Sequence, residues 1–150
     1  MNKFLLLALM TVFSAVSFAQ SDREVEWTFT AKKIADKTYE VHMTANIKGD
    51  YHMYAQDGGD GPVSTSFTFK KSPLLLLEGE VKEVGKVKKV YEDAFKSQVK
   101  YYEGTVTFVQ VVKLKGNAKT NLAGSVEFMV CNAHECLPPA TVNFSIPIGG

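Results

Sequence analysis

Apolar and polar residues alternate along most of the chain, and this pattern constrains the fold more than any other feature. The alternation is clearest in 25–29 and in 39–47, where every odd position is apolar. Side chains of a strand point in turn to opposite faces of the sheet, so a period of two predicts strands with one buried face. The same reasoning predicts further strands at 64–70, 80–90, 98–102, 105–114, 125–131 and 141–148.

Turn-forming residues separate these segments. Gly, Pro, Asn and Asp recur between them, around 36–37, 48–50, 56–62, 72–73, 103–104, 115–117 and 138–139. No segment shows the 3.6-residue period of a long amphipathic helix, and there is neither an internal repeat nor a low-complexity linker. About eight short strands at regular spacing favour an all-β fold, an immunoglobulin-like β-sandwich, in one domain over 20–150.

The first residues have the pattern of a secretory leader. Lys3 precedes an apolar run over 4–18 that lacks acidic residues and ends in the small-x-small sequence 17–19. The run is shorter than the roughly 20 apolar residues that a spanning helix needs. We therefore predict a signal peptide over 1–19, cleavage after Ala19, and a periplasmic or otherwise extracytoplasmic mature chain that does not insert into the membrane.

Charge argues against some partners of the mature chain. The whole sequence has 17 Lys and Arg and 16 Asp and Glu, and the predicted leader holds one Lys and no acid, so the remaining 131 residues carry a net charge of zero. Neutrality gives no reason to expect binding to nucleic acid or to an anionic membrane surface. A monomer of this length can bury a hydrophobic core without a disulfide, so a disulfide here is free to serve chemistry.

Two segments interrupt the regular pattern. The acidic, glycine-rich segment 57–62 could bind calcium through carboxylates or could be a long hairpin loop, and its glycine spacing, which matches no known calcium loop, favours the hairpin. The four leucines of 74–77 predict a buried strand or the edge of a sheet.

Cys131 and Cys136 are the only two cysteines in the chain. Cys131 ends an apolar strand, and the prolines at 138–139 place Cys136 in a tight surface turn. A bridge that closes so short a loop adds only about 2 kcal/mol on the chain-entropy model. Exposed or strained bridges are the ones most easily reduced, whereas a structural bridge in such a sandwich would span the two sheets.

The residues around the cysteines are compatible with other chemistry. A protonated His134 could lower a thiol pKa and Glu135 would oppose it, but both could equally be solvated loop residues. Zinc would use Cys131, His134 and Cys136 and needs a fourth ligand, for which only two histidines, at 42 and 52, remain. No grouping of Ser, His and acid indicates a hydrolase, and we expect no cofactor and no metal.

The cysteine segment resembles a known family. The stretch 131–139, with a strand before it and the strand 141–148 after it, is similar to the end of the periplasmic N-terminal domain of the thiol-disulfide interchange protein DsbD. Tyr54 resembles a tyrosine that lies beside the cysteines in that family, and His52 stands where a second tyrosine is often found. Segment 91–96 looks like the family's cap loop, in which acidic residues precede an aromatic residue, here Phe95.

The resemblance implies a redox module. Cys136 would form a mixed disulfide with a thioredoxin-like partner, Cys131 would resolve it, and Phe95 with Tyr54 would shield the pair; Phe95 could also be an ordinary core aromatic. The family's full-length member also carries a membrane electron conduit and a thioredoxin-like domain, which this sequence does not contain, so electrons would come from a separate protein. The alternative is a noncatalytic binding module in which a structural hairpin disulfide holds a recognition loop.

Overall fold

The computed structural model describes residues 21–150, so the predicted leader over 1–19 lies outside the described residues. One turn of 3-10 helix precedes eleven strands in this part of the chain. The elements are η1 Ser21–Arg23, β1 Val25–Ala35, β2 Thr38–Ile47, β3 His52–Tyr54, β4 Ser66–Phe69, β5 Leu75–Val84, β6 Lys88–Glu92, β7 Ser97–Tyr102, β8 Thr105–Leu114, β9 Thr120–Phe128, β10 Val130–Cys131 and β11 Ala140–Ile148. Over this range, no helix has the length and apolar character needed to cross a membrane.

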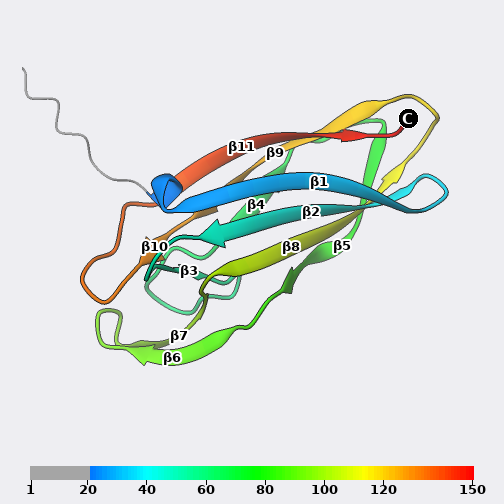
Figure 1. The fold of residues 1–150 in the computed structure, drawn as a ribbon. Coiled ribbons are helices and arrows are strands. Elements are labelled where there is room, and N and C mark those ends of the chain that lie inside the picture. The colour runs from blue at the N-terminus through cyan, green and yellow to red at the C-terminus, as the bar shows by residue number, and fades with distance from the viewer. Residues whose placement is uncertain (1–20) are drawn as a thin grey trace, which may run out of the picture.

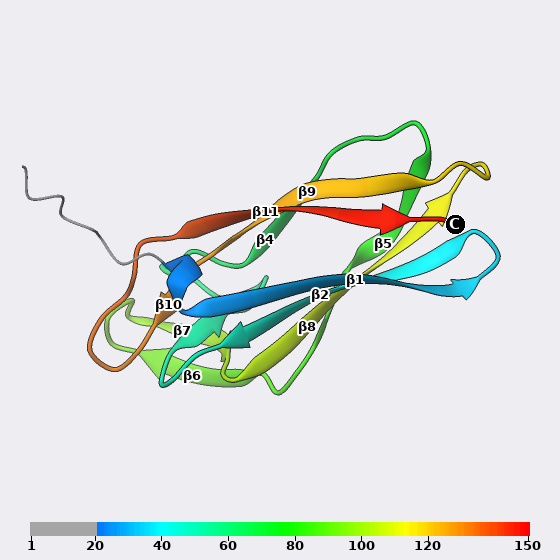
Figure 2. The same cartoon turned by 45° about the horizontal axis from the view of Figure 1, so that its top comes forward.

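The strands form antiparallel sheets with the orders β1-β2-β8-β5, β11-β9-β4 and β10-β3-β7-β6. The β11-β9-β4 sheet lies over the β1-β2-β8-β5 sheet along the length of the molecule, and the third sheet lies at the end where η1 is found (Figures 1 and 2). Two antiparallel layers around a shared core make the fold an immunoglobulin-like β-sandwich, which confirms the fold class predicted from the alternation.

Aromatic rings from facing sheets fill the core. The ring centroid of Trp27 on β1 lies 5.4 Å from that of Phe128 on β9 and 6.2 Å from that of Phe67 on β4. Phe29 on β1 and Phe144 on β11 make a similar contact at 5.0 Å. Rings of this size bury large apolar areas and prefer such edge-on or tilted packing, so the inward positions of the alternating segments hold the two layers together.

The segment predicted as a single strand over 80–90 is two strands in different sheets. β5 ends at Val84 and β6 begins at Lys88. Gly85 lies at the crossing, and a Cβ added there would come within 3.1 Å of the Tyr102 ring. The single-strand prediction was wrong because alternation reports which side of a strand is buried, whereas the sheet that a strand joins depends on distant partners.

A second crossing divides the predicted strand over 125–131. β9 ends at Phe128, and β10 continues into the third sheet with Val130 and Cys131. Met129, the residue that links the two strands, is buried. The sequence stays apolar across this crossing, because Phe128 before it and Val130 and Cys131 after it are all buried. The crossing takes Cys131 out of the main sandwich and into the small sheet.

The four leucines of 74–77 lie at a sheet edge, one of the two alternatives considered for them. Leu75 begins the outer strand β5 and is 8% exposed, whereas Leu76 and Leu77 are exposed. An outer strand is covered by a neighbouring strand on one side only. This explains why Leu75 is buried while Leu76 and Leu77 remain exposed.

The small sheet β10-β3-β7-β6 has a hydrophobic cluster of its own. Tyr54, Val99, Met129 and Cys131 are its buried members, and Phe95 packs against them from the turn between β6 and β7. We call this group the satellite cluster. It places one of the two cysteines and the predicted cap residues in a single packed unit.

Candidate functional site

The two cysteines form a disulfide that closes a short hairpin. Cys131 ends β10, and Cys136 returns opposite it as an antiparallel bridge, with an S–S bond of 2.04 Å. The side-chain Oδ1 of Asn132 accepts hydrogen bonds from the backbone N–H groups of His134 and Glu135, both at 2.9 Å. Asn commonly stabilises tight turns in this way, so Asn132 brings the second cysteine back to the first.

The two halves of the disulfide differ in exposure. Cys131 is 2% exposed within the satellite cluster, whereas Cys136 is exposed on the surface of the hairpin. A thiolate that approaches from solvent therefore meets Cys136, and Cys131 is the sulfur that leaves when the bond breaks.

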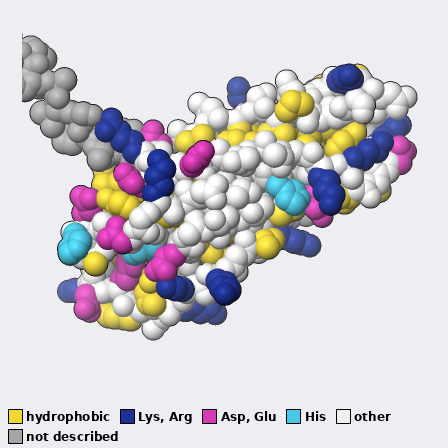
Figure 3. All heavy atoms as spheres, viewed as in Figure 1, with side chains coloured by type: hydrophobic (Ala, Val, Ile, Leu, Met, Phe, Trp, Pro, Cys, Tyr) yellow, Lys and Arg dark blue, Asp and Glu magenta, His cyan; other side chains and the backbone are white. Residues whose placement is uncertain are grey.

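A cavity of about 470 Å³ opens beside the disulfide. Residues 91–94, at the end of β6 and in the turn after it, form one wall, and the cysteine hairpin forms another; His52 and Tyr101 also line the cavity. Four of the lining residues are Asp or Glu, and none is Lys or Arg. Acidic side chains gather at this end of the molecule (Figure 3), an environment that disfavours a thiolate once the bridge is reduced.

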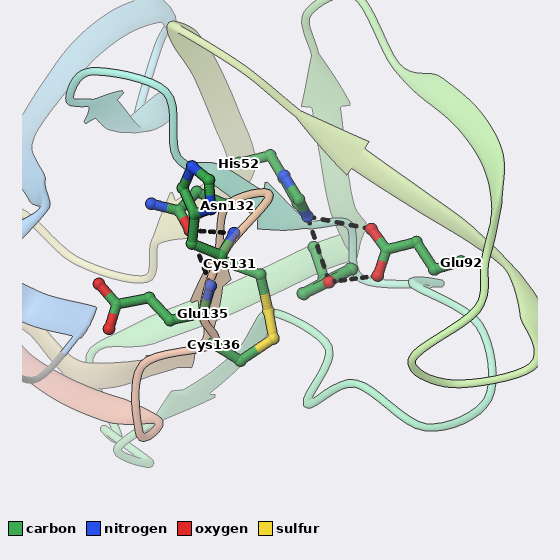
Figure 4. A network of polar contacts seen from close by, with 8 residues as sticks. His52, Glu92, Cys131, Asn132, Glu135 and Cys136 are labelled. Atoms are coloured by element: carbon green, nitrogen blue, oxygen red, sulfur yellow. Dashed lines mark hydrogen bonds and ion pairs between the residues drawn. A yellow bond between two sulfur atoms is a disulfide. The ribbon is translucent and has the colours of Figure 1, made fainter.

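A polar cluster ties the turn after β6 to β3. Glu92, the last residue of β6, accepts a hydrogen bond from the Tyr54 hydroxyl at 2.8 Å through Oε2 and pairs with His52 Nε2 at 3.1 Å through Oε1. The His52 Nε2 and the Tyr54 hydroxyl are themselves 3.2 Å apart. Figure 4 shows the His52 side chain directed at Glu92. The three side chains form one network that holds the turn over the small sheet.

Burial governs the protonation of this cluster. It lowers the pKa of His52 below the ordinary value, and the neighbouring Glu92 carboxylate partly opposes this effect. Burial also raises the pKa of Tyr54 well above its usual range, and the hydrogen bond to Glu92 adds to the shift. Both directions favour the uncharged form near neutral pH, a neutral imidazole at His52 and a protonated phenol at Tyr54.

Glu135 binds Tyr51 in the oxidised structure. The Tyr51 hydroxyl donates to Glu135 Oε1 at 2.7 Å, and this hydrogen bond to the carboxylate raises the pKa of Tyr51 to about 12. Tyr51 immediately precedes β3, so the contact anchors the hairpin to the small sheet. His134 is exposed at the tip of the hairpin.

Phe95 is half-buried and packs on the satellite cluster. Its ring meets the buried Tyr54 edge-on, with the centroids 6.0 Å apart. The cavity wall, however, is made by the preceding residues 91–94. The structure thus places both predicted cap residues beside Cys131 in the cluster, with Phe95 at the base of the turn that borders the disulfide.

The glycine-rich segment 57–62 packs against the same turn. A Cβ on Gly61, whose φ is +109°, would lie 2.6 Å from Cδ1 of Phe95. The Ser97 hydroxyl donates to the Asp60 carbonyl at 2.6 Å, and Asp57 pairs with Lys100 of β7. These contacts describe a loop that supports the turn after β6. The predicted hairpin was wrong, because the strands that this loop joins, β3 and β4, lie in different sheets.

The described residues do not form the zinc site considered from the sequence. Within 21–150, no three His, Cys, Asp or Glu side chains are gathered as a metal site would need. Both cysteine sulfurs are in the disulfide, and His42 lies on β2 beside Glu40.

Sequence reasoning gave no role to two residues of this site. Glu92 was recognised only as one of the acidic residues before Phe95, and its contacts with β3 join segments about forty residues apart. Asn132 had a local signal, because an Asn directly after a strand and within a short loop favours a side-chain-capped turn.

The described chain is thus an immunoglobulin-like sandwich whose hairpin disulfide is buried at Cys131, exposed at Cys136 and set beside a cavity. The family model described as "Thiol:disulfide interchange protein DsbD, N-terminal" matches residues 17–147. The chain belongs to this family, and the family resemblance read from the cysteine segment is confirmed.

Solved structures share the fold. The reduced N-terminal domain of DsbD from Neisseria meningitidis aligns with a TM-score of 0.59 and 17% identity over 88% of this chain and 91% of that one. The N-terminal periplasmic domain of ScsB from Proteus mirabilis aligns with a TM-score of 0.58 and 13% identity, covering 83% of this chain and 46% of that one. Among curated protein sequences, none matches the chain.

Proposed function

We propose that this domain relays electrons in an extracytoplasmic compartment, from a thioredoxin-like donor to other disulfide proteins, through Cys131 and Cys136. The observation that supports this most is the unequal exposure of the bridge. Cys136 is open to a partner at the edge of a cavity, and Cys131 is buried behind it.

Each transfer balances as two exchange steps. A donor thiolate attacks Cys136 Sγ, the Cys131–Cys136 bond breaks, and Cys131 leaves with the electron pair and takes up a proton. A second donor thiolate then attacks the mixed disulfide and releases Cys136, so the donor is oxidised and the domain gains two electrons. The reduced domain passes them on when Cys136 attacks an acceptor disulfide and Cys131 resolves the product.

The family and the leader predicted over 1–19 support the proposed extracytoplasmic compartment. The matched family takes its name from an interchange protein whose N-terminal domain the chain resembles, and export would place the cysteines where disulfides persist. We further propose that the exported domain acts as a monomer that docks its donor transiently, through a small interface around Cys136.

The equilibrium potential of the bridge tests this function. Mature protein is equilibrated with glutathione or dithiothreitol buffers, and free thiols are counted by alkylation. A relay should have a potential of about −270 to −120 mV, as thioredoxin-like proteins do. A value below about −300 mV would contradict the relay and support the binding module with a structural bridge.

Trapping separates the roles of the two cysteines. A Cys131→Ser variant, treated with a thionitrobenzoate disulfide to activate its remaining thiol, should accumulate a mixed disulfide with a thioredoxin-like donor variant that lacks its own second cysteine. The donor thiolate displaces thionitrobenzoate from the exposed Cys136, and neither protein then has a thiol that resolves the product. Cys136→Ser is the matched control and should trap little, since Cys131 is buried. Equal trapping by both variants would remove the assigned order of attack.

For Phe95 we propose a shielding role exerted through the turn that it anchors. Its ring packs on Tyr54 at the base of that turn, and the turn borders the disulfide. Phe95→Ala should free the turn and speed reduction of the bridge by small thiols. An unchanged rate would leave Phe95 as an ordinary core aromatic.

A further inference from the structure

His52 is the direct cross-strand neighbour of the buried cysteine. In the antiparallel pair β3 and β10, His52 stands opposite Cys131. Residues paired in this way project from the same face of the sheet, with Cβ atoms about 4.5–5.5 Å apart. Both residues also line the cavity beside the disulfide, so the imidazole and the buried cysteine border the same space.

The His52 ring is held in place from two sides. It stacks on Tyr101 of β7 with the centroids 4.0 Å apart, and its Nε2 is bound by Glu92 at 3.1 Å and by the Tyr54 hydroxyl at 3.2 Å. With Nε2 donating to the carboxylate, Nδ1 of the neutral ring is the nitrogen that can take a proton. Both polar contacts that hold the ring, to Glu92 and to Tyr54, use Nε2.

The groups that face His52 come from every strand of the small sheet. They are Tyr54 on its own strand, Glu92 and the more distant Lys88 on β6, Tyr101 on β7 with Glu103 just after it, and Cys131 on β10. The carboxylates favour an imidazolium, while burial and Lys88 oppose it. The affinity of the ring for a proton therefore depends on burial and Lys88, which lower it, and on the carboxylates, which raise it.

Cys131 needs a nearby base. Cys131 is 2% exposed and lines a cavity that also holds four Asp or Glu side chains and no Lys or Arg, surroundings in which a thiolate is disfavoured. In the resolving step, however, it must attack as a thiolate. Near neutral pH hydroxide is too dilute to deprotonate such a thiol quickly, so an adjacent side chain that removes the proton accelerates the step.

We propose that His52 accepts the Cys131 thiol proton when Cys131 resolves a mixed disulfide, with Glu92 as the positioning residue. This inference rests on the proposed thiol-disulfide exchange. The proton passes from Cys131 Sγ to His52, the thiolate attacks Cys136 Sγ, and the Cys131–Cys136 bond forms. The acceptor's sulfur leaves as a thiolate and takes a proton from solvent, and His52 later releases its own proton through the cavity.

Single-turnover oxidation of the reduced domain isolates this step. Reduced protein is mixed with excess oxidised glutathione between pH 5 and 9.5 and quenched with acid, and mass spectrometry follows the glutathione adduct on Cys136 and its loss. Three proteins are compared: wild type, His52→Gln, and the control His42→Gln. His42 also pairs with a glutamate, Glu40 at 3.0 Å, but on β2 in another sheet.

In His52→Gln, resolution near pH 7 should slow by about 100-fold, the lower range for loss of a general base. Its rate should rise tenfold per pH unit and approach that of wild type at pH 9.5, which shows that the variant still folds around its cysteines. His42→Gln should match wild type throughout. Glu92→Gln should slow resolution less than His52→Gln does and shift the midpoint of the pH profile.

A wild-type pH profile in His52→Gln would overturn the inference. Slow resolution that alkaline pH does not rescue would also overturn it, because the defect would then be structural. Failure of the proposed function gives a different result, an equilibrium potential below about −300 mV, while wild type and His52→Gln still differ in the rate of resolution.

Discussion

Gly61 shapes the site because it has no Cβ. Its φ of +109° is unfavourable for a residue with a Cβ, and an added Cβ would lie 2.6 Å from Phe95. Gly61→Ala should therefore destabilise the fold by about 1–3 kcal/mol from backbone strain and displace Phe95 as well. Urea unfolding measures the first effect, and the rate of bridge reduction by dithiothreitol measures the second.

Gly49→Ala is a matched control for that prediction. Gly49 also has a positive φ, +59°, but nothing lies within 4 Å of the Cβ position. It should cost stability without changing the reduction rate. If both variants altered the rate equally, the contact with Phe95 would not be the cause.

His52 is a second single residue with a measurable effect, because it makes the stability of the fold depend on pH. Because burial holds its pKa below the ordinary 6.5, the folded state binds this proton less readily than the unfolded state does. The resulting loss of stability is absent above pH 6.5 and grows as the pH falls toward the pKa of His52 in the folded state. The urea midpoint of the oxidised domain should be lower at pH 5 than at pH 7.5, and the drop should shrink in His52→Gln. An equal drop in the variant would assign the effect to other groups.

At the scale of elements, η1 fastens the start of the described chain to the cysteine hairpin. Ser21 is fully buried; its hydroxyl donates to the Pro138 carbonyl at 2.8 Å and accepts from the Val130 N–H at 3.1 Å. Ser21→Ala leaves that buried N–H without its acceptor and should cost about 1–3 kcal/mol. Chemical denaturation of the oxidised protein gives the value.

Ser145→Ala provides the comparison, because Ser145 is exposed on β11. Such a substitution should change stability by less than about 0.5 kcal/mol. Similar losses in the two variants would show that the tie between η1 and β10 contributes little.

For the whole molecule, the bridge should be dispensable for folding. It closes a loop between residues five apart in sequence, which stabilises the fold by only about 2 kcal/mol on the entropic model. The aromatic core between the main sheets lies elsewhere, around Trp27 and Phe108. Reduced protein should still unfold cooperatively, at a somewhat lower urea concentration and with an unchanged m-value.

Fluorescence of Trp27, the only tryptophan, reports this transition. Phe108→Ala, which opens a cavity in the core, should cost more than reduction does, about 3–5 kcal/mol. Loss of a cooperative transition on reduction alone would mean that the bridge is structural, and would weaken the relay.

Much of the fold could be predicted because strand alternation is local. Positions 39–47 show which side chains turn inward, and β2 follows that pattern closely, with its odd positions buried. The cysteine pair was equally visible, since two cysteines five residues apart before two prolines can meet only in a tight hairpin.

Tertiary structure alone decided the rest. The sheet crossings at Gly85 and Met129 depend on which distant strands pair, and a period of two is the same in either sheet. Glu92 meets His52 only because β6 and β3 both flank β7. The unequal exposure of the two sulfurs has the same origin. The satellite cluster covers Cys131 with residues from across the chain, whereas Cys136 lies in the exposed turn that Asn132 closes.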